Sequence, residues 1–281
     1  MVLRSLRKIV GPARLVGVLL IALAGAAIAV EGADRPRLEA FLKVTGFDVA
    51  LESIAMSAKD APEMLGMSAS DFGADWSRTA ETVFAKEVLH EIALDILDQT
   101  LSDDLLTAAA EFYASPLGVR LVAEENASHM IEDTEMKQAE GAALLEQAEP
   151  GRVAQLIRLT EAVDSGDVAI SSIREVQVRF LMAASAAGVI DREIDEAALR
   201  QILGAGDAEL RESLKISALN GAAHTYRSFS EDELAAYADA LEAPKMQQVY
   251  QLMNAIQFEI MAERFEVLAL RMADLGPGQA L

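Results

Sequence analysis

The sequence LSDDLLTAAAEFYASPLG occupies residues 101–118 and contains the starts of two helices. The Ser102 hydroxyl is placed to cap the first helix, and the two acids after it favour the positive end of the helix dipole. Pro116 suits the first turn of a second, long helix, where its missing N–H costs no hydrogen bond. An acidic loop that binds a cation is the alternative, but these acids follow the pattern of any helix start.

The same pattern returns in residues 229–244, where FSED replaces LSDD. Pro244 follows Asp232 by the same number of residues as Pro116 follows Asp104. Here Ser230 and Glu233 also form a capping box. Two upstream pairs of segments match in the same order: 37–45 with 152–160, and 48–54 with 167–173. The repetition predicts a tandem duplication of one helical unit, with its boundary at Glu149-Pro150-Gly151.

The composition between these landmarks favours helices. Long stretches rich in Ala, Leu, Glu, Met and Gln contain no proline, and no sustained alternation of polar and apolar residues indicates a strand. Residues 68–100 carry apolar residues on two sides, which predicts a central helix. The predicted fold is all-α, a tandem duplication of an antiparallel helical-bundle unit.

The N-terminus has the layout of a secretory signal peptide. Four basic residues precede the uncharged run from Leu15 to Val30, which contains the small-residue pattern Ala27-Ile28-Ala29. An uncleaved anchor is the alternative, but a run of about 16 residues is shorter than the roughly 20 that a bilayer core needs. We therefore expect a signal peptide at 1–29, helical repeat units at 30–149 and 150–275, and a flexible tail at 276–281, with the mature protein in the periplasm.

Charge and cysteine content exclude several classes of function. Without residues 1–29 the chain has 20 Lys and Arg against 45 Asp and Glu, a net charge of −25. Such an acidic surface repels phosphate backbones and anionic lipids, so we expect no nucleic-acid partner. Acidic residues interrupt every later apolar stretch, so we expect no membrane span after cleavage of the signal. The absence of cysteine from the sequence excludes disulfides and thiolate sites.

The stretch at 101–118 also resembles the bacterial domain-of-unknown-function 2059 family. An acidic helix start followed by Phe-Tyr-x-Ser-Pro-x-Gly is the family's hallmark, represented here by Phe112, Tyr113, Ser115, Pro116 and Gly118. A degenerate version lies in the second unit. The resemblance implies an exported, all-helical periplasmic protein of Gram-negative bacteria and brings no established catalytic residues.

Physically, this motif predicts packing. Phe112 and Tyr113 fill space between helices, and Gly118 allows a neighbouring helix to approach closely. A ligand-binding role for the aromatic pair is the alternative. Met246, Met253, Met261 and Met272 are interpreted as core filler rather than as an adaptable partner groove.

The three histidines give no complete site. Glu87-x-x-His90 has the spacing of a helical di-metal site, but the second Glu-x-x-His is missing, so we interpret His90 as a core histidine bonded to Glu87 or to a carbonyl. His129 lies at helical spacing from Glu125 and Glu132, which predicts exposed charge pairing. The alternative is a cluster that raises the pKa of His129 or weakly holds a divalent ion.

Nucleophilic serine and phosphate-loop motifs are also missing from the sequence. We therefore predict no catalytic, cofactor-binding or metal-binding residues. The chain is expected to be a non-enzymatic binding or scaffolding protein whose partner is another protein of the cell envelope. The alternatives are a periplasmic protein that binds divalent cations or a small ligand, and a hydrolase whose residues assemble across the two units.

Overall fold

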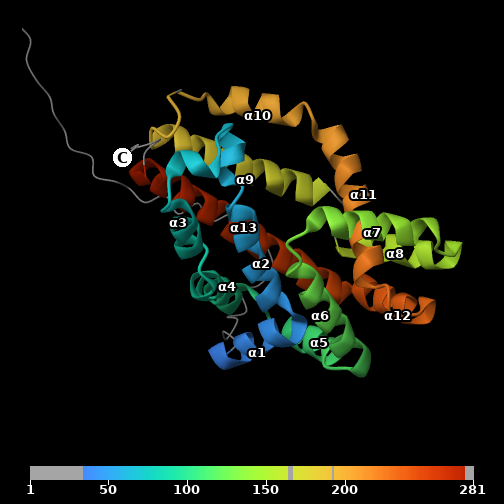
Figure 1. The fold of residues 1–281 in the computed structure, drawn as a ribbon. Coiled ribbons are helices and arrows are strands. Elements are labelled where there is room, and N and C mark those ends of the chain that lie inside the picture. The colour runs from blue at the N-terminus through green and yellow to red at the C-terminus, as the bar shows by residue number, and fades with distance from the viewer. Residues whose placement is uncertain (1–33, 164–166, 192, 276–281) are drawn as a thin grey trace, which may run out of the picture. The chain divides into compact units, whose positions relative to one another are not determined.

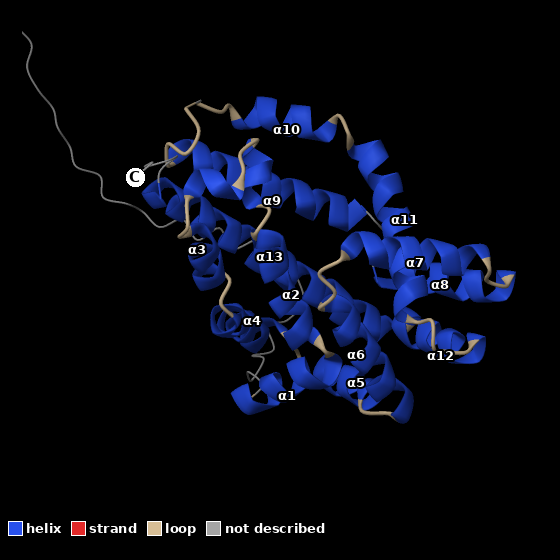
Figure 2. Cartoon of the chain, viewed as in Figure 1, coloured by secondary structure: helices blue, strands red, loops and turns tan. Residues whose placement is uncertain are grey.

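The computed structural model describes residues 34–163, 167–191 and 193–275, and in these ranges every regular element is a helix (Figures 1 and 2). This confirms the all-α prediction. The predicted signal peptide and tail lie outside the described residues. The elements are α1 (Arg35–Thr45), α2 (Phe47–Ala58), η1 (Ala61–Leu65), η2 (Ala69–Phe72), α3 (Trp76–Val83), α4 (Lys86–Thr100), α5 (Asp103–Tyr113), α6 (Pro116–His129), α7 (Thr134–Glu146), α8 (Pro150–Val163), α9 (Asp167–Ala186), α10 (Glu196–Gly204), α11 (Asp207–Thr225), α12 (Glu231–Glu242) and α13 (Pro244–Leu275).

The predicted helix starts are present, but only one of the two serine caps forms as expected. Ser230 accepts a hydrogen bond from the Glu233 amide at 3.2 Å, and the Glu233 carboxylate accepts one from the Ser230 amide at 2.8 Å. Ser102 occupies the N-cap position of α5 without capping it, because its hydroxyl donates to the Asp104 carboxylate at 2.7 Å. The prediction of a capping Ser102 side chain is therefore wrong.

Alanine substitution distinguishes the two serines. We expect Ser230→Ala to lower the free energy of unfolding by about 1 kcal/mol, because the first turn of α12 loses its cap. Ser102→Ala removes no cap and is expected to cost less than half as much. Urea unfolding of the two variants measures the difference, and equal losses would contradict the assignment.

The predicted central helix over residues 68–100 is wrong, because the chain breaks it into η2, α3 and α4. Gly73 at φ 74° ends η2 in a conformation that other residues rarely adopt. Between α3 and α4, Phe84 turns into the core and meets the ring of Phe265 edge-on, with centroids 5.3 Å apart. Burying this ring separates α3 from α4, so residues 68–100 do not form one continuous helix.

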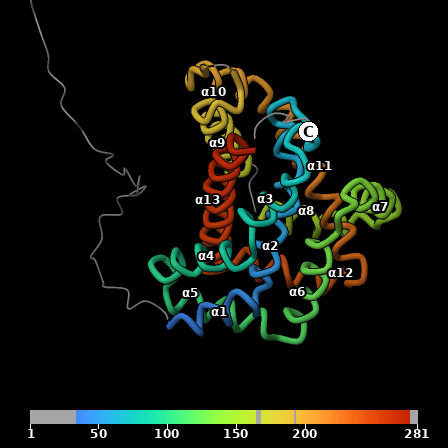
Figure 3. Tube along the Cα trace, turned by 60° about the vertical axis from the view of Figure 1, so that its left-hand side comes forward, coloured from blue at the N-terminus to red at the C-terminus, as the bar shows by residue number. Residues whose placement is uncertain are grey.

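The long helix α13 joins the two predicted units. It packs against α2, α3, α4 and α5 of the first unit and lies along α9 of the second, side by side in both Figure 1 and Figure 3. Met246, Met253 and Met272 are buried in the core and Met261 is packed against it, which confirms the interpretation as core filler. Both units therefore contribute to one hydrophobic core.

Helix pairing repeats between the two units. In the first, α1 packs on α4 and α5, and α2 packs on α6; in the second, α8 packs on α11 and α12, and α9 packs on α13. The two matching pairs of segments in the sequence lie on α1 and α8 and on α2 and α9. A duplication predicts that the helices of each pair contact corresponding partners. The duplication itself stays a prediction.

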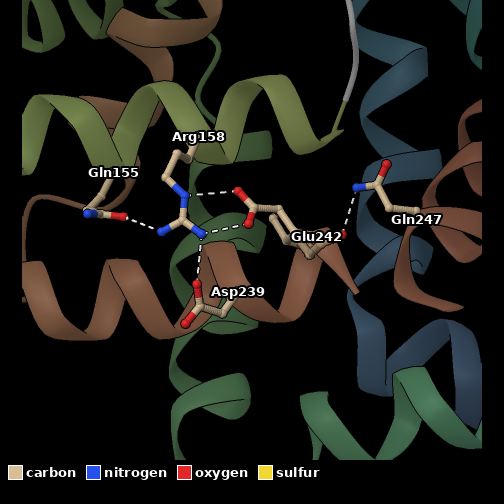
Figure 4. A network of polar contacts seen from close by, with 6 residues as sticks. Gln155, Arg158, Asp239, Glu242 and Gln247 are labelled. Carbon is tan, nitrogen blue, oxygen red and sulfur yellow. Dashed lines mark hydrogen bonds and ion pairs between the residues drawn. The ribbon is translucent and has the colours of Figure 1, made fainter. Parts of the chain in front are cut away.

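An ion-pair network fixes α8 against α12 (Figure 4). The Arg158 guanidinium donates to both carboxylate oxygens of Glu242, at 2.9 and 2.6 Å, and to Asp239 at 2.7 Å. Nearby, the Gln247 amide donates to the carbonyl of Leu241 at 2.7 Å. The forked geometry holds α8 in register with α12, and α8 supplies one wall of the cavity described next.

A candidate ligand-binding cavity with a tyrosine-held glutamate

A cavity of about 720 Å³ lies among α6, α7, α8 and α11. Its walls are mainly apolar, with Ile157 and Val163 from α8 and Leu214 and Leu219 from α11. This volume is in the range of protein sites for small molecules, which combine apolar walls with a few polar groups.

Several polar side chains line the α6 side of the cavity. The hydroxyls of Ser128 and Thr225 are 2.7 Å apart, and the Lys137 ammonium donates to the Ser128 carbonyl oxygen at 3.1 Å. Burial lowers the pKa of Lys137. Glu125 lies on α6 one helical turn before Ser128 and also lines the cavity.

All four tyrosines of the sequence surround Glu125. Tyr226 and Tyr237 each donate a hydrogen bond to Glu125 Oε1, at 2.7 and 2.8 Å. Behind them, the hydroxyls of Tyr113 and Tyr250 hydrogen-bond one another and each lies 3.1 Å from that of Tyr237. These five residues are called the tyrosine cluster below; four lie on α5, α6, α12 and α13, and Tyr226 directly follows α11.

Desolvation controls the protonation of the tyrosine cluster. Burial raises the pKa of Glu125 to about 7, although the hydroxyls of Tyr226 and Tyr237 stabilise the carboxylate and limit the rise. Burial also raises the pKa of each tyrosine, so the hydroxyls remain donors at neutral pH. Glu125 is thus an ionisable group that titrates close to physiological pH.

One carboxylate oxygen of Glu125 remains available. Both tyrosine hydrogen bonds end on Oε1. Within the described ranges no side chain donates to Oε2 or forms an ion pair with Glu125, and Oε2 is not among the buried atoms that lack a partner, so it is open to solvent. Because Glu125 lines the cavity, this oxygen is a polar anchor beside apolar walls.

The structure overturns the predicted charge cluster around His129. Glu125 turns inward to the tyrosine cluster, and Glu132 lies 3.9 Å from the Lys59 ammonium. His129 lines the cavity and stays exposed, and the surrounding protein atoms and the charge of Lys137 lower its pKa rather than raise it. The expected exposed cluster was wrong because Tyr226 and Tyr237 come from distant parts of the chain.

The other two histidines lie outside this cavity. His90 Nε2 is 3.2 Å from the Asp48 carbonyl oxygen, which confirms the predicted bond to a carbonyl, although the side chain is only partly buried. His224 is buried, with Nδ1 3.2 Å from Glu140. No group of three His, Asp or Glu side chains among the described residues has an arrangement that could hold a metal ion.

The aromatic motif combines packing with a polar role that the sequence interpretation missed. A Cβ at Gly118 would lie 2.3 Å from the Phe112 carbonyl oxygen, so α6 approaches the end of α5 as closely as predicted. Phe112 stacks on Tyr237 with ring centroids 5.7 Å apart. Tyr113, however, also contributes its hydroxyl to the tyrosine cluster.

Residues 87–147 match the family model "Uncharacterized protein conserved in bacteria (DUF2059)". This confirms the resemblance found in the motif. The DUF2059 segment contains α5, α6 and α7 and thus supplies Tyr113, Glu125 and Lys137, whereas α8, α11 and the other three tyrosines lie after it. Comparisons of the chain with curated proteins and with solved structures give no match.

Proposed function

We propose that this chain is a non-enzymatic binding protein whose cavity takes a small, mainly apolar ligand. The cavity itself carries this proposal, since its volume, its apolar walls and its few polar groups are those of a small-molecule site. Packing of α8 on α11 and α12, and of α7 on α11, holds these walls in place without a ligand. A preformed site keeps the entropic cost of binding low.

Filling the cavity tests the proposal. Ala218 on α11 lines the cavity and is exposed, so Ala218→Trp places an indole in the cavity without displacing core residues. We expect it to weaken the binding of 1-naphthylmethanol, an uncharged two-ring probe, at least tenfold in titration calorimetry. Ala208→Trp, at an exposed position of α11 outside the cavity, is the matched control and should change the affinity less than twofold.

The outcome separates the cavity from the rest of the surface. Equal affinities for the wild type and both variants would place the probe elsewhere and remove the support for a cavity ligand. No binding to the wild type would have the same consequence.

We also propose export to the periplasm, which the basic N-terminus and the Ala27-Ile28-Ala29 pattern support. None of the described helices is long and apolar enough to cross a membrane. Native mass spectrometry of untagged protein released from its own envelope tests export and ligand binding together. Export predicts the mass of residues 30–281, and a retained ligand adds to it; the mass of the full chain would contradict cleavage.

A protein partner is the second proposal. Two large apolar side chains, Ile202 on α10 and Ile216 on α11, are 72% and 53% exposed. Exposed apolar groups on two consecutive helices support contact with another protein of the envelope. A photo-crosslinker at position 202 should give a protein adduct in the native envelope, and a crosslinker that gives none would remove this support.

None of the described helices carries a metal-ion arrangement that would favour the cation-binding alternative. Calcium or zinc should therefore give no heat of binding in titration calorimetry, and saturable binding of either ion would revive that alternative.

A further inference from the structure

We infer that the ligand of this cavity carries a protonated amine that pairs with Glu125 beside an apolar body. The inference rests on the proposed function and adds the chemical class of the ligand. It follows from three observations on the described residues: an available carboxylate oxygen, a missing counter-charge, and a shell of tyrosines that holds the carboxylate in place.

The first observation is the direction of the hydrogen bonds. Tyr226 and Tyr237 both donate to Oε1 of Glu125 and leave Oε2 without a donor from the described residues. Glu125 is partly exposed at the cavity, so water can reach Oε2 when no ligand is bound. The remaining oxygen is therefore a ready acceptor for a group that enters the cavity.

The second observation is electrostatic. The groups that face Glu125 from the helices packed around it are the hydroxyls of the tyrosine cluster, which are neutral donors. They stabilise the carboxylate without neutralising it. A ligand ammonium supplies the missing positive charge, and a hydrogen bond between two charged groups is stronger than one between neutral groups.

Three titratable groups with a nitrogen line the cavity, Lys137, Lys215 and His129, and Glu161 is a second carboxylate in the lining. Lys215 and Glu161 are exposed to solvent. The Lys137 ammonium already donates to the Ser128 carbonyl oxygen. Ser128 lies three residues after Glu125 on α6, which is a rise of about 4.5 Å in an ideal α-helix. His129 is exposed. The charge of Lys137 disfavours an ammonium beside Ser128, so the open oxygen of Glu125 is the place that we infer for a cation.

The third observation is the rigidity of the anchor. Phe112 stacks on Tyr237, and Tyr226 and Tyr237 meet edge-on at 5.8 Å, so the hydroxyls that hold Glu125 belong to rings fixed by packing. A carboxylate held in this way loses little freedom when it binds a ligand. The apolar walls then select the body of the ligand.

Matched probes test the inference. In titration calorimetry at pH 8 with the full chain as isolated, we expect 1-naphthylmethylamine to bind at least tenfold more tightly than 1-naphthylmethanol, which has the same ring system. We expect Glu125→Gln to weaken the amine about tenfold to a hundredfold and the alcohol less than twofold. Gln keeps the size of the side chain and an acceptor oxygen for the tyrosines.

The controls separate charge from fold. Circular dichroism shows whether Glu125→Gln is folded, and its binding of the alcohol shows whether the cavity is intact. Lys137→Met removes a positive charge from the same cavity and should leave amine binding unchanged or tighter. If Glu125→Gln does not fold, the wild-type preference for the amine and the effect of Lys137→Met still decide the question.

The pH dependence is a further readout. The amine stays charged between pH 5 and pH 8, whereas Glu125, whose pKa is about 7, is mostly protonated at pH 5. The amine should therefore bind about tenfold more weakly for each pH unit below 7 and reach a plateau above it. The alcohol should not follow this curve.

Each outcome has a distinct meaning. If the alcohol binds as tightly as the amine, or if Glu125→Gln leaves amine binding unchanged, the inferred ligand class is overturned while cavity binding stands. If neither probe binds the wild type, the proposed function fails and the inference fails with it.

Discussion

Between pH 4.5 and pH 8 the wild-type chain should lose about 3 kcal/mol of folding stability that the Glu125→Gln variant keeps. Burial raises the pKa of Glu125 from 4.5 to about 7, so the folded state holds a proton over a pH range in which the unfolded state has released it. Each unit of this difference corresponds to about 1.4 kcal/mol.

The sign of the effect follows from proton binding. Below pH 4.5 the carboxyl is protonated in both states, and the stabilisation is complete. As the pH rises through 7, the folded state must also release the proton, and the buried carboxylate is left without a counter-charge. Stability therefore falls with rising pH, which is opposite to the usual behaviour of a salt-bridged acid.

Urea unfolding of wild type and Glu125→Gln at pH 4.5, 5.5, 6.5 and 8 measures this effect. Titration of the other acids and histidines cancels in the difference between the two proteins. A difference that stays constant with pH would show that Glu125 has an ordinary pKa and that its carboxylate is solvated. Saturation with 1-naphthylmethylamine should reduce the loss at pH 8, since the ligand supplies the counter-charge.

Gly141→Ala should cost about 2–3 kcal/mol, because α7 and α11 touch through their backbones at this position. A Cβ at residue 141 would lie 2.0 Å from the Asn220 carbonyl oxygen, closer than any real contact. The methyl group must push α7 away from α11, and overpacking of this kind destabilises a fold. Since both helices line the cavity, probe binding should also weaken.

Gly221→Ala, on the same helix pair, is the matched control. Its Cβ would meet only side-chain atoms of Lys137 and Gln138, at 3.9 and 4.0 Å, which is ordinary contact. Alanine in this helix interior should therefore stabilise the chain by about 0.5–1 kcal/mol. Urea unfolding of both variants checks the prediction, and equal effects would mean that α7 and α11 are further apart.

Local rules predicted much of the fold. The starts of α5, α6, α12 and α13 follow from Ser-acid and proline signals that act within one helical turn. The break at Phe84 was missed because helical periodicity continues across it. The burial of that ring against Phe265, about 180 positions away, outweighs the local pattern.

The site was much less predictable. Helical spacing from His129 predicts an exposed Glu125, and the four tyrosines have no regular spacing in the sequence. Only the packing of α5, α11, α12 and α13 around α6 brings the hydroxyls together. The one signal in the sequence is the Phe112-Tyr113 pair, for which ligand binding is the alternative to packing.

A crystal structure of the chain grown with 1-naphthylmethylamine at pH 8 tests the central claim most directly. We expect the naphthyl ring between α8 and α11, with the amine nitrogen about 2.8 Å from a carboxylate oxygen of Glu125. A ring in the cavity with its nitrogen directed away from Glu125, or a cavity left empty at a concentration that saturates binding in solution, would contradict the account.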